Sequence, residues 1–261
     1  MVSTLLVATC GLMLVGCSNS SPDHSESGCA TLSISAPCRL LFIGNSYTYV
    51  NHLPAMFARL ARAGGRTVET GILAEGGATL ADHLASPETE KALRSARWNV
   101  VVLQEQSEIP SIERFRQAEM YPAVRQLVRM TRDAGAQPML YLTWAHRTGW
   151  PQDGLIGYAS MQSAVDDGYL VIARELHATV APVGYAWAKV FETEASSGLW
   201  QSDGSHPTIK GTYLAACVFY ATVFRQSPNG LAYHAGLPKH EASELQAIAS
   251  NVALDVSRFR Q

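Results

Sequence analysis

The fold of this chain is indicated first by residues 39–47, which read RLLFIGNSY. Arg39–Ile43, with an unbroken apolar run from Leu40 to Ile43, predicts a short β-strand that is buried on both faces, as in a parallel sheet. Gly44 permits a tight turn after the strand and places Ser46 at the mouth of the following helix. We expect that helix to begin near Pro54 and to end at Gly64-Gly65, since proline suits the first helical position and glycine the end.

The same alternation of short apolar runs and longer amphipathic runs continues to the end of the chain. Such βα units predict one three-layer α/β/α domain over residues 38–261, with a central, mostly parallel five-stranded sheet of the flavodoxin-like kind. The remaining predicted strands are Thr67–Leu73, Val100–Leu103, Pro138–Thr143 and Thr179–Val183. The remaining predicted helices are Ile112–Ala134, Tyr158–His177, Thr208–Phe224 and Glu241–Phe259. Residues 145–157, rich in glycine, predict a surface loop at a sheet edge.

Composition and motifs exclude several classes of function. The 261 residues carry 20 Lys and Arg against 22 Asp and Glu, a net charge of -2, so neither a nucleic acid nor an anionic membrane is an expected partner. The five cysteines lack the spacings of a zinc module, and no glycine-rich phosphate loop occurs. We therefore expect no metal and no cofactor, and specificity that depends on a local site for a small molecule or glycan.

The N-terminus has the pattern of an export signal. Residues 1–16 are almost continuously apolar but too short for a permanent membrane span, which predicts a signal peptide. Leu14-Val15-Gly16-Cys17 resembles the lipobox of bacterial lipoproteins, in which the cysteine is lipidated, and residues 17–37 would then form a polar tether. The alternatives are an ordinary cleaved signal or a buried N-terminal strand. The lipobox implies a periplasmic or outer-membrane-anchored protein whose membrane contact is the lipid on Cys17.

Export would place the cysteines in an oxidising compartment. Cys29 and Cys38, separated by a short loop, can form a disulfide there that ties down the N-terminal segment. Cys217 lies within an apolar helical run, which favours a small buried side chain.

Residues that follow the strands are the first candidates for chemistry, because ligands bind beyond the carboxyl ends of strands in open parallel sheets. Ser46 follows the first strand and can be a nucleophile. Near the C-terminus the stretch Asp203-Gly204-Ser205-His206-Pro207 precedes a long apolar helix. Its three-residue spacing lets the Asp203 carboxylate approach one nitrogen of the His206 imidazole, while the other nitrogen faces a serine. These residues predict a Ser-His-Asp triad.

Attack by a serine on an ester also requires donors for the developing oxyanion. The glycines of Glu75-Gly76-Gly77-Ala78-Thr79 follow the second strand and would let main-chain amides approach a substrate. Gln104-Glu105-Gln106-Ser107 follows the third strand and offers side-chain amides from the opposite side. The sequence thus supplies both backbone and side-chain donors.

Together these blocks resemble the SGNH (GDSL-like) hydrolase superfamily, whose landmark residues are Ser, Gly, Asn and His in ordered blocks. The resemblance implies that Ser46 is the nucleophile, that His206 is the general base and then the acid, and that Asp203 orients His206. It also implies that the amides of Ser46 and Gly77 line the oxyanion hole. Asn45 stands where the family usually has aspartate. Gln106 falls where the family has asparagine and is expected to be the third donor, with Gln104 as the competing choice.

Residues 144–147 follow the fourth predicted strand and are expected on the rim of the same cleft. Trp144 and Arg147 are candidates for substrate contact there. Asp166 and Asp167 point in different directions on a helix and are expected to be solvated. The remaining histidines are expected to be solvated or satisfied imidazoles, His146 being set apart by its place on the rim; they are His52, His83, His177, His234 and His240.

We therefore expect an exported serine esterase that hydrolyses a carboxylic ester through an acyl-enzyme. The absence of a long apolar lid favours short acyl groups, and the resemblance favours an acetyl group on a carbohydrate. The alternatives are a lysophospholipase, thioesterase or arylesterase on the same site, or a non-catalytic glycan-binding lipoprotein. The sequence leaves the oligomeric state open.

Overall fold

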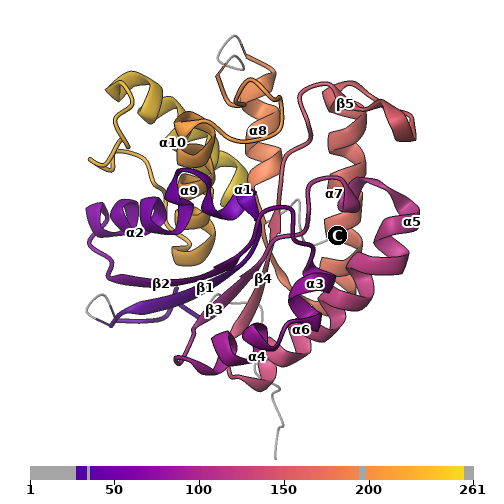
Figure 1. Cartoon of the computed structure of the whole chain (residues 1–261). Helices are drawn as coiled ribbons and strands as arrows, with labels where there is room; N and C mark the ends of the chain where they lie inside the picture. The colour runs from indigo at the N-terminus through magenta and orange to yellow at the C-terminus, as the bar shows by residue number, and fades with distance from the viewer. Residues whose placement is uncertain (1–27, 34–35, 194–197, 256–261) are drawn as a thin grey trace, which may run out of the picture.

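A computed structural model describes residues 28–33, 36–193 and 198–255 of the chain. Its centre is a parallel sheet of five strands in the order β2-β1-β3-β4-β7, with helices packed on both faces (Figure 1). The strands are β1 (Cys38–Gly44), β2 (Val68–Ala74), β3 (Val100–Leu103), β4 (Gln137–Leu142) and β7 (Thr179–Pro182). The three-layer α/β/α architecture and all five predicted sheet strands are confirmed.

The strands form because their apolar runs can be buried on both faces of the sheet. All four residues of β3 are buried, and in β1 only Arg39 is not. The edge strand β2 is only partly covered, and Ile72 is 50% exposed. Since β1 pairs with β2 on one side and β3 on the other, its carboxyl end lies well inside the sheet. Ser46 therefore follows an interior strand.

The helices divide into two layers. One face of the sheet carries α2 (Leu53–Ala63), α8 (Val183–Phe191), α9 (Ile209–Phe224) and α10 (Lys239–Ala253) (Figure 1). The other carries α3 (Leu80–Ala85), α4 (Pro87–Arg94), α5 (Glu113–Phe115), α6 (Tyr121–Asp133) and α7 (Gly157–Leu176). The short α1 (Ser46–Tyr49) and the 3-10 turns η1 (Val50–His52), η2 (Ile109–Ser111) and η4 (Pro151–Asp153) lie in the connections.

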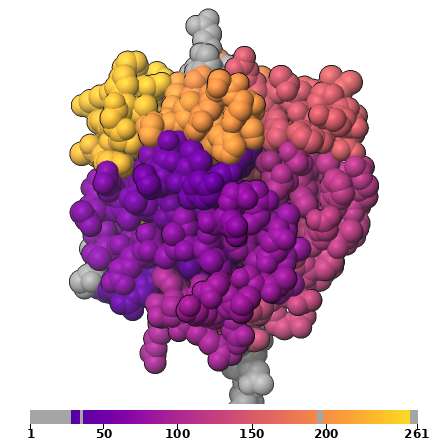
Figure 2. Space-filling view, viewed as in Figure 1, coloured from indigo at the N-terminus to yellow at the C-terminus, as the bar shows by residue number. Residues whose placement is uncertain are grey.

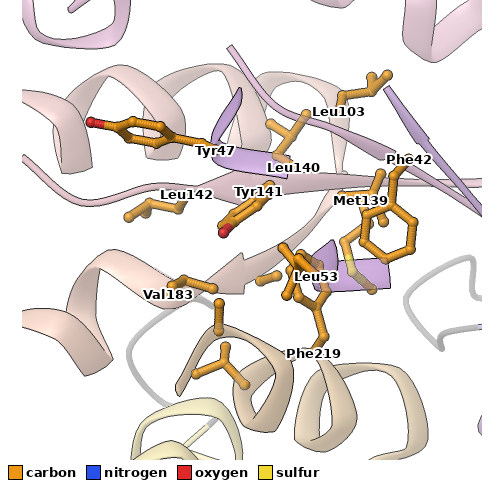
Figure 3. Packing of buried hydrophobic residues seen from close by; sticks show 14 of the residues in the cluster. Phe42, Tyr47, Leu53, Leu103, Met139, Leu140, Tyr141, Leu142, Val183 and Phe219 are labelled. Atoms are coloured by element: carbon orange, nitrogen blue, oxygen red, sulfur yellow. The ribbon is translucent and has the colours of Figure 1, made fainter. Parts of the chain in front are cut away.

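The helix α9 is packed against the centre of the sheet. Figure 3 shows Phe42 from β1, Tyr141 from β4 and Phe219 from α9 turned toward one another. The ring of Phe219 lies edge-on to Phe42 at 5.4 Å and to Tyr141 at 4.9 Å between centroids. Full burial of each such ring contributes about 1.5–3 kcal/mol to folding. This packing fixes α9, and with it the loop that carries His206, against the strand that precedes Ser46.

The predicted helix Ile112–Ala134 contains an irregularity. After α5 the chain makes a π-helical segment, η3 (Arg116–Met120), before α6 begins. Pro122 lies in the first turn of α6, and a proline inside a helix lacks an N–H and clashes with the carbonyl four residues earlier. Widening of the preceding turn relieves that clash.

Residues 145–157 are more ordered than the predicted loop. They include a two-stranded antiparallel hairpin of β5 (Gly149–Trp150) and β6 (Leu155–Ile156). The hairpin follows β4, which pairs with both β3 and β7, so the expected position at a sheet edge is wrong. The hairpin follows a strand next to the edge strand β7 and packs against α7.

Near the N-terminus, Cys29 and Cys38 form the expected disulfide, with Cα atoms 5.6 Å apart, and Cys217 is a buried free cysteine. The predicted signal peptide and the lipidated Cys17 lie outside the described residues. Within the described ranges, none of the helices has the length and apolar character that a membrane span requires.

Candidate active site

Loops from distant parts of the chain enclose one cavity at the carboxyl edge of the sheet. Its volume is about 380 Å³, and its lining comes from the loops after β1, β2, β3 and β4 and from the loop before α9. In the space-filling view the indigo surface of the first helices meets the orange surface of the chain near residue 200 (Figure 2). The expected convergence of these loops follows from parallel strands ending at one edge.

Ser46, His206 and Asp203 are hydrogen-bonded in series. Ser46 Oγ lies 2.9 Å from His206 Nε2, and His206 Nδ1 lies 2.6 Å from Asp203 Oδ2. The second carboxylate oxygen, Oδ1, accepts the backbone N–H groups of Ser205 at 2.9 Å and His206 at 3.0 Å. One oxygen of Asp203 therefore holds the loop while the other holds the imidazole.

Electrostatics favour the ionised form of Asp203. Partial desolvation raises the pKa of this carboxyl, but the hydrogen bonds from Ser205 and His206 outweigh it and leave the pKa below its usual value. A carboxylate beside Nδ1 fixes the tautomer in which Nε2 can accept a proton from Ser46.

The turn that carries Ser46 is held by Asn45 and Gln104. The Asn45 side chain caps α1 by accepting the N–H of Tyr47, and its Nδ2 donates to Ala78 O at 3.0 Å. Gln104 Oε1 accepts the Asn45 N–H at 2.9 Å, and Gln104 Nε2 donates to Asn45 Oδ1 at 2.9 Å. Asn45 thus links the turn of Ser46 to the loops after β2 and β3, which explains why an amide side chain suits this position.

Backbone donors are available beside Ser46. Gly77, with φ of +74°, lines the cavity with Gly76. Among the described residues, neither the Ser46 N–H nor the Gly77 N–H donates to a protein acceptor. An oxyanion hole is usually formed by such unpaired backbone N–H groups at one cavity.

The two candidate glutamines differ in their surroundings. Gln104 is fully buried, and its Nε2 donates to Asn45 Oδ1 and Glu105 O, so both of its amide protons are used. Gln106 lines the cavity, and its Nε2 makes one hydrogen bond, to Glu108 Oε2 at 3.0 Å. Its Oε1 accepts the Glu108 N–H at 2.8 Å. Gln106 therefore keeps one donor for a ligand, and Gln104 has none to offer.

Glu105 joins the loops behind the cavity. Its Oε1 accepts the N–H groups of Leu80 at 3.0 Å and Gln106 at 2.7 Å, while Oε2 is buried without a partner. Burial raises the pKa of this carboxyl to about 7. Sequence analysis does not identify this role of Glu105, since a charged residue after a strand ordinarily faces solvent.

Trp144 does not reach the cavity. Its ring is completely buried, stacked on Tyr47 at 4.5 Å and on Trp187 at 3.9 Å, and its Nε1 donates to Ser205 O at 2.9 Å. The prediction that Trp144 contacts a substrate is therefore wrong. Its large apolar ring is instead buried between Tyr47 and Trp187, as is usual for a tryptophan whose N–H has a hydrogen-bond acceptor.

Arg147 is exposed beside the loop of Asp203, and its backbone N–H donates to Gly204 O at 2.8 Å. It does not line the cavity, and a substrate contact for Arg147 stays a prediction. Its neighbour His146 does line the cavity, together with Tyr47, Ser107 and Ser205. The position of residues 144–147 after a strand indicated this rim, but not which side chain faces it.

Two polar residues away from the cavity have structural partners. His83 is buried, and its Nε2 lies 2.7 Å from Gly44 O, so it is a satisfied imidazole as expected. Asp166 was expected to be solvated, but its carboxylate accepts a hydrogen bond from Gln162 Nε2 at 2.8 Å, and burial raises its pKa to about 7. Gln162 Oε1 in turn accepts the Ala145 N–H at 2.8 Å. No cluster of potential metal ligands occurs in the part of the chain that the structure describes.

Comparisons with known proteins give the family. No protein-family model and no curated protein matches the sequence. A DUF4886 family protein from Bacteroides uniformis has a similar structure, with a TM-score of 0.74 and 20% identity over 84% of this chain and 96% of that one. Axe2, an acetylxylan esterase from Geobacillus stearothermophilus, shares the fold with a TM-score of 0.56 and 19% identity, covering 72% and 94%.

A protein from Slackia heliotrinireducens assigned as an SGNH hydrolase is 32% identical, with a TM-score of 0.61. The match covers 70% of this chain and 97% of that one. At this identity over nearly the whole length of the relative, the chain belongs to the SGNH hydrolase superfamily.

Proposed function

We propose that the protein is a serine esterase that hydrolyses short-chain carboxylic esters through an acyl-enzyme. The observation that carries the proposal is the continuous hydrogen-bonded series from Asp203 through His206 to Ser46 at the wall of a cavity. A hydroxyl, an imidazole and a carboxylate in this order activate the hydroxyl as a nucleophile.

In the acylation step, Ser46 Oγ attacks the ester carbonyl carbon while its proton passes to His206 Nε2. The imidazolium that forms is stabilised by Asp203, which stays ionised. Negative charge develops on the carbonyl oxygen, and we assign its stabilisation to the N–H groups of Ser46 and Gly77 and to the Gln106 amide, all from residues that line the cavity. Each such donor contributes about 3 kcal/mol to transition-state stabilisation.

The tetrahedral intermediate collapses when the bond to the alcohol oxygen breaks and His206 returns its proton to that oxygen. The alcohol leaves, and the acyl group remains on Ser46. Water then attacks the acyl carbon with His206 as the base, and a second collapse frees the carboxylic acid and regenerates Ser46.

The cavity supports a short acyl group and a polar alcohol. Its lining is made of polar, glycine and tyrosine residues, without a leucine, isoleucine, valine, methionine or phenylalanine from the described residues. A long alkyl chain would meet none of these side chains in the cavity wall, which disfavours the lysophospholipase alternative. An acetyl group on a carbohydrate fits better, and one of the proteins with a similar fold is an acetylxylan esterase.

The test of this proposal is covalent labelling followed by chain-length profiling. A fluorophosphonate probe should modify Ser46, located by peptide mass spectrometry, and Ser46→Ala should remove both label and activity. Ser163→Ala, an exposed serine on α7, is the matched control and should keep both. Activity on p-nitrophenyl esters should be highest for acetate and decline as the acyl chain grows.

An unlabelled Ser46 would support the non-catalytic glycan-binding alternative, and maximal activity on long acyl chains would support a lipid substrate.

We also infer that the protein is exported and anchored by a lipid on Cys17. The lipobox-like sequence supports this inference, and so does the Cys29–Cys38 disulfide, since disulfides persist in oxidising compartments. Metabolic labelling with palmitate in a bacterial host should mark the wild type but not Cys17→Ala. Equal labelling of both proteins would exclude Cys17 as the lipid attachment site.

A further inference from the structure

A second histidine lines the same cavity as the proposed triad. His146 Nε2 lies 3.0 Å from Ser107 Oγ and 3.1 Å from Ser205 Oγ. Ser205 Oγ is in turn 2.6 Å from the Tyr47 hydroxyl. We call these four residues, all of which line the cavity, the His146 cluster. The acyl-enzyme mechanism uses none of their side chains.

In the order of the strands, Gly77 and His146 lie on opposite sides of Ser46. In the sheet order β2-β1-β3-β4-β7, Gly77 follows β2, Ser46 follows β1 and His146 follows β4. Adjacent strands are about 4.8 Å apart, so the segment of His146 lies roughly 10 Å along the sheet from that of Ser46. A substrate that extends from Ser46 away from Gly77 approaches the cluster.

The part of an ester that extends this way is the alcohol. His206 must protonate the leaving alcohol oxygen, so the alcohol lies beside His206. Ser205, the residue before His206, belongs to the cluster. The leaving alcohol, which takes its proton from His206, therefore lies next to the hydroxyls and the imidazole of the cluster.

The chemistry of the cluster suits neutral hydroxyl groups. Burial lowers the pKa of His146, with a further lowering by His206, against the raising effects of Glu108 and Asp203. The ring is thus neutral near pH 7, and a neutral imidazole can accept at one nitrogen and donate at the other. Serine and tyrosine hydroxyls likewise donate or accept as a partner requires.

Anionic alcohols fit this part of the cavity poorly. The Glu108 carboxylate lies on the cavity wall, and none of the described Lys and Arg residues lines the cavity. A phosphate group, as in a lysophospholipid, would meet a negative charge without a positive partner. The surroundings of Ser46 therefore select against an anion on the alcohol side.

We propose that His146, with Ser107 and Ser205, hydrogen-bonds hydroxyl groups of the alcohol part of the ester and so selects esters of neutral polyhydroxy alcohols such as sugars. This inference rests on the proposed esterase activity. It assigns substrate specificity to a residue outside the triad.

Two acetates that differ in hydroxyl groups provide the test: a mono-O-acetylated methyl glycoside and cyclohexyl acetate, which has a ring but no hydroxyl. The measured quantity is the ratio of their kcat/KM values. The wild type should prefer the glycoside acetate, and His146→Ala should reduce this preference about tenfold, the size of one lost hydrogen bond. His146→Asn, which retains a donor and an acceptor, should restore part of it.

Ser107→Ala should shift the ratio of kcat/KM values in the same direction. If thermal unfolding shows that His146→Ala does not fold, Ser107→Ala is used for the test in its place. His240→Gln, an exposed histidine on α10, is the control and should keep the wild-type ratio.

An unchanged ratio in both His146→Ala and Ser107→Ala overturns the inference. The inference is overturned even if kcat/KM falls for both esters, because a merely structural role lowers the two values equally and leaves their ratio unchanged. A wild-type preference for cyclohexyl acetate overturns it as well. A wild type that hydrolyses neither ester and takes no fluorophosphonate at Ser46 instead overturns the esterase proposal, on which the inference depends.

Discussion

At the scale of single residues, the two glutamines after β3 have different roles. Gln106 faces the cavity with one amide proton free, whereas both amide protons of Gln104 hold the turn of Ser46. Gln106→Ala should lower kcat by about two orders of magnitude, because one oxyanion donor is lost. The urea midpoint of unfolding should stay close to that of the wild type. Steady-state kinetics with p-nitrophenyl acetate and urea titration check both expectations.

Unlike Gln106→Ala, which should lower kcat, Gln104→Ala should chiefly lower the stability of the protein. It leaves the Asn45 N–H and the Thr48 hydroxyl without their buried acceptor, which costs about 1–3 kcal/mol for each unsatisfied group. If Gln104→Ala lost activity with unchanged stability while Gln106→Ala kept its activity, the assignment of the third donor would be reversed.

At the scale of elements, the strand-turn-helix unit of β1 and α1 depends on Gly44. A Cβ at this position would lie 2.7 Å from Thr48 Oγ1 and would clash with the Gln104 side chain. We expect Gly44→Ala to destabilise the protein by about 1–3 kcal/mol through overpacking. Chemical denaturation measures the change. Gly65→Ala is the contrasting variant, since a Cβ there meets no neighbour and its strain comes from a positive φ alone.

The short helix α3 begins with a capping box formed by Thr79 and Asp82. Thr79 Oγ1 accepts the Asp82 N–H at 3.0 Å, and the Asp82 carboxylate accepts the Thr79 N–H at 2.9 Å. Thr79→Ala should cost about 1 kcal/mol of stability in urea unfolding. Because the loop of Gly77 leads into this cap, the same variant should also reduce kcat. Wild-type kcat in Thr79→Ala would show that the cap does not position Gly77.

At the scale of the whole molecule, one fully buried carboxyl, Glu105, and one half-buried carboxyl, Asp166, contribute to the pH dependence of the free energy of unfolding. The pKa of Glu105 and that of Asp166 are each raised by burial to about 7. Between about pH 4.5 and pH 7 the unfolded chain releases these protons while the folded chain keeps them. The contribution of these two groups to the free energy of unfolding therefore falls as pH rises through this window, by about 1.4 kcal/mol per pH unit for each group.

For Glu105 the total loss from pH 4.5 to 7 is about 3 kcal/mol. Glu105→Gln removes this contribution, so its free energy of unfolding should fall less than that of the wild type between pH 5 and pH 8. Urea titrations at both pH values measure the difference. Parallel pH dependence in the two proteins would mean that Glu105 is ionised throughout the window.

The disulfide is a second feature of the whole molecule, because it joins the N-terminal segment to the start of the interior strand β1. The bond links cysteines separated by 9 residues. Its loss in the Cys29→Ser, Cys38→Ser double variant should cost about 2–3 kcal/mol. Thermal unfolding with and without reductant checks this value, and reductant should change the wild type but not the double variant.

The sequence by itself determined the order of the elements and the blocks of the candidate site. Continuous apolar runs identify buried strands, Gly44 and Gly77 mark the turns after β1 and β2, and the Asp203–His206 spacing marks the loop before α9, because these signals are local. The short helices α3, α4 and α8 were not predicted, although Thr79 and Asp82 show a capping pattern that could have revealed α3.

Only the tertiary structure decided which side chains face the cavity. Trp144 and His146 lie two residues apart after the same strand, yet Trp144 is enclosed by Tyr47 and Trp187 while His146 meets Ser107 and Ser205. The choice between Gln104 and Gln106 and the burial of Glu105 were decided in the same way. Each outcome depends on neighbours from other strands and helices, which local sequence patterns do not specify.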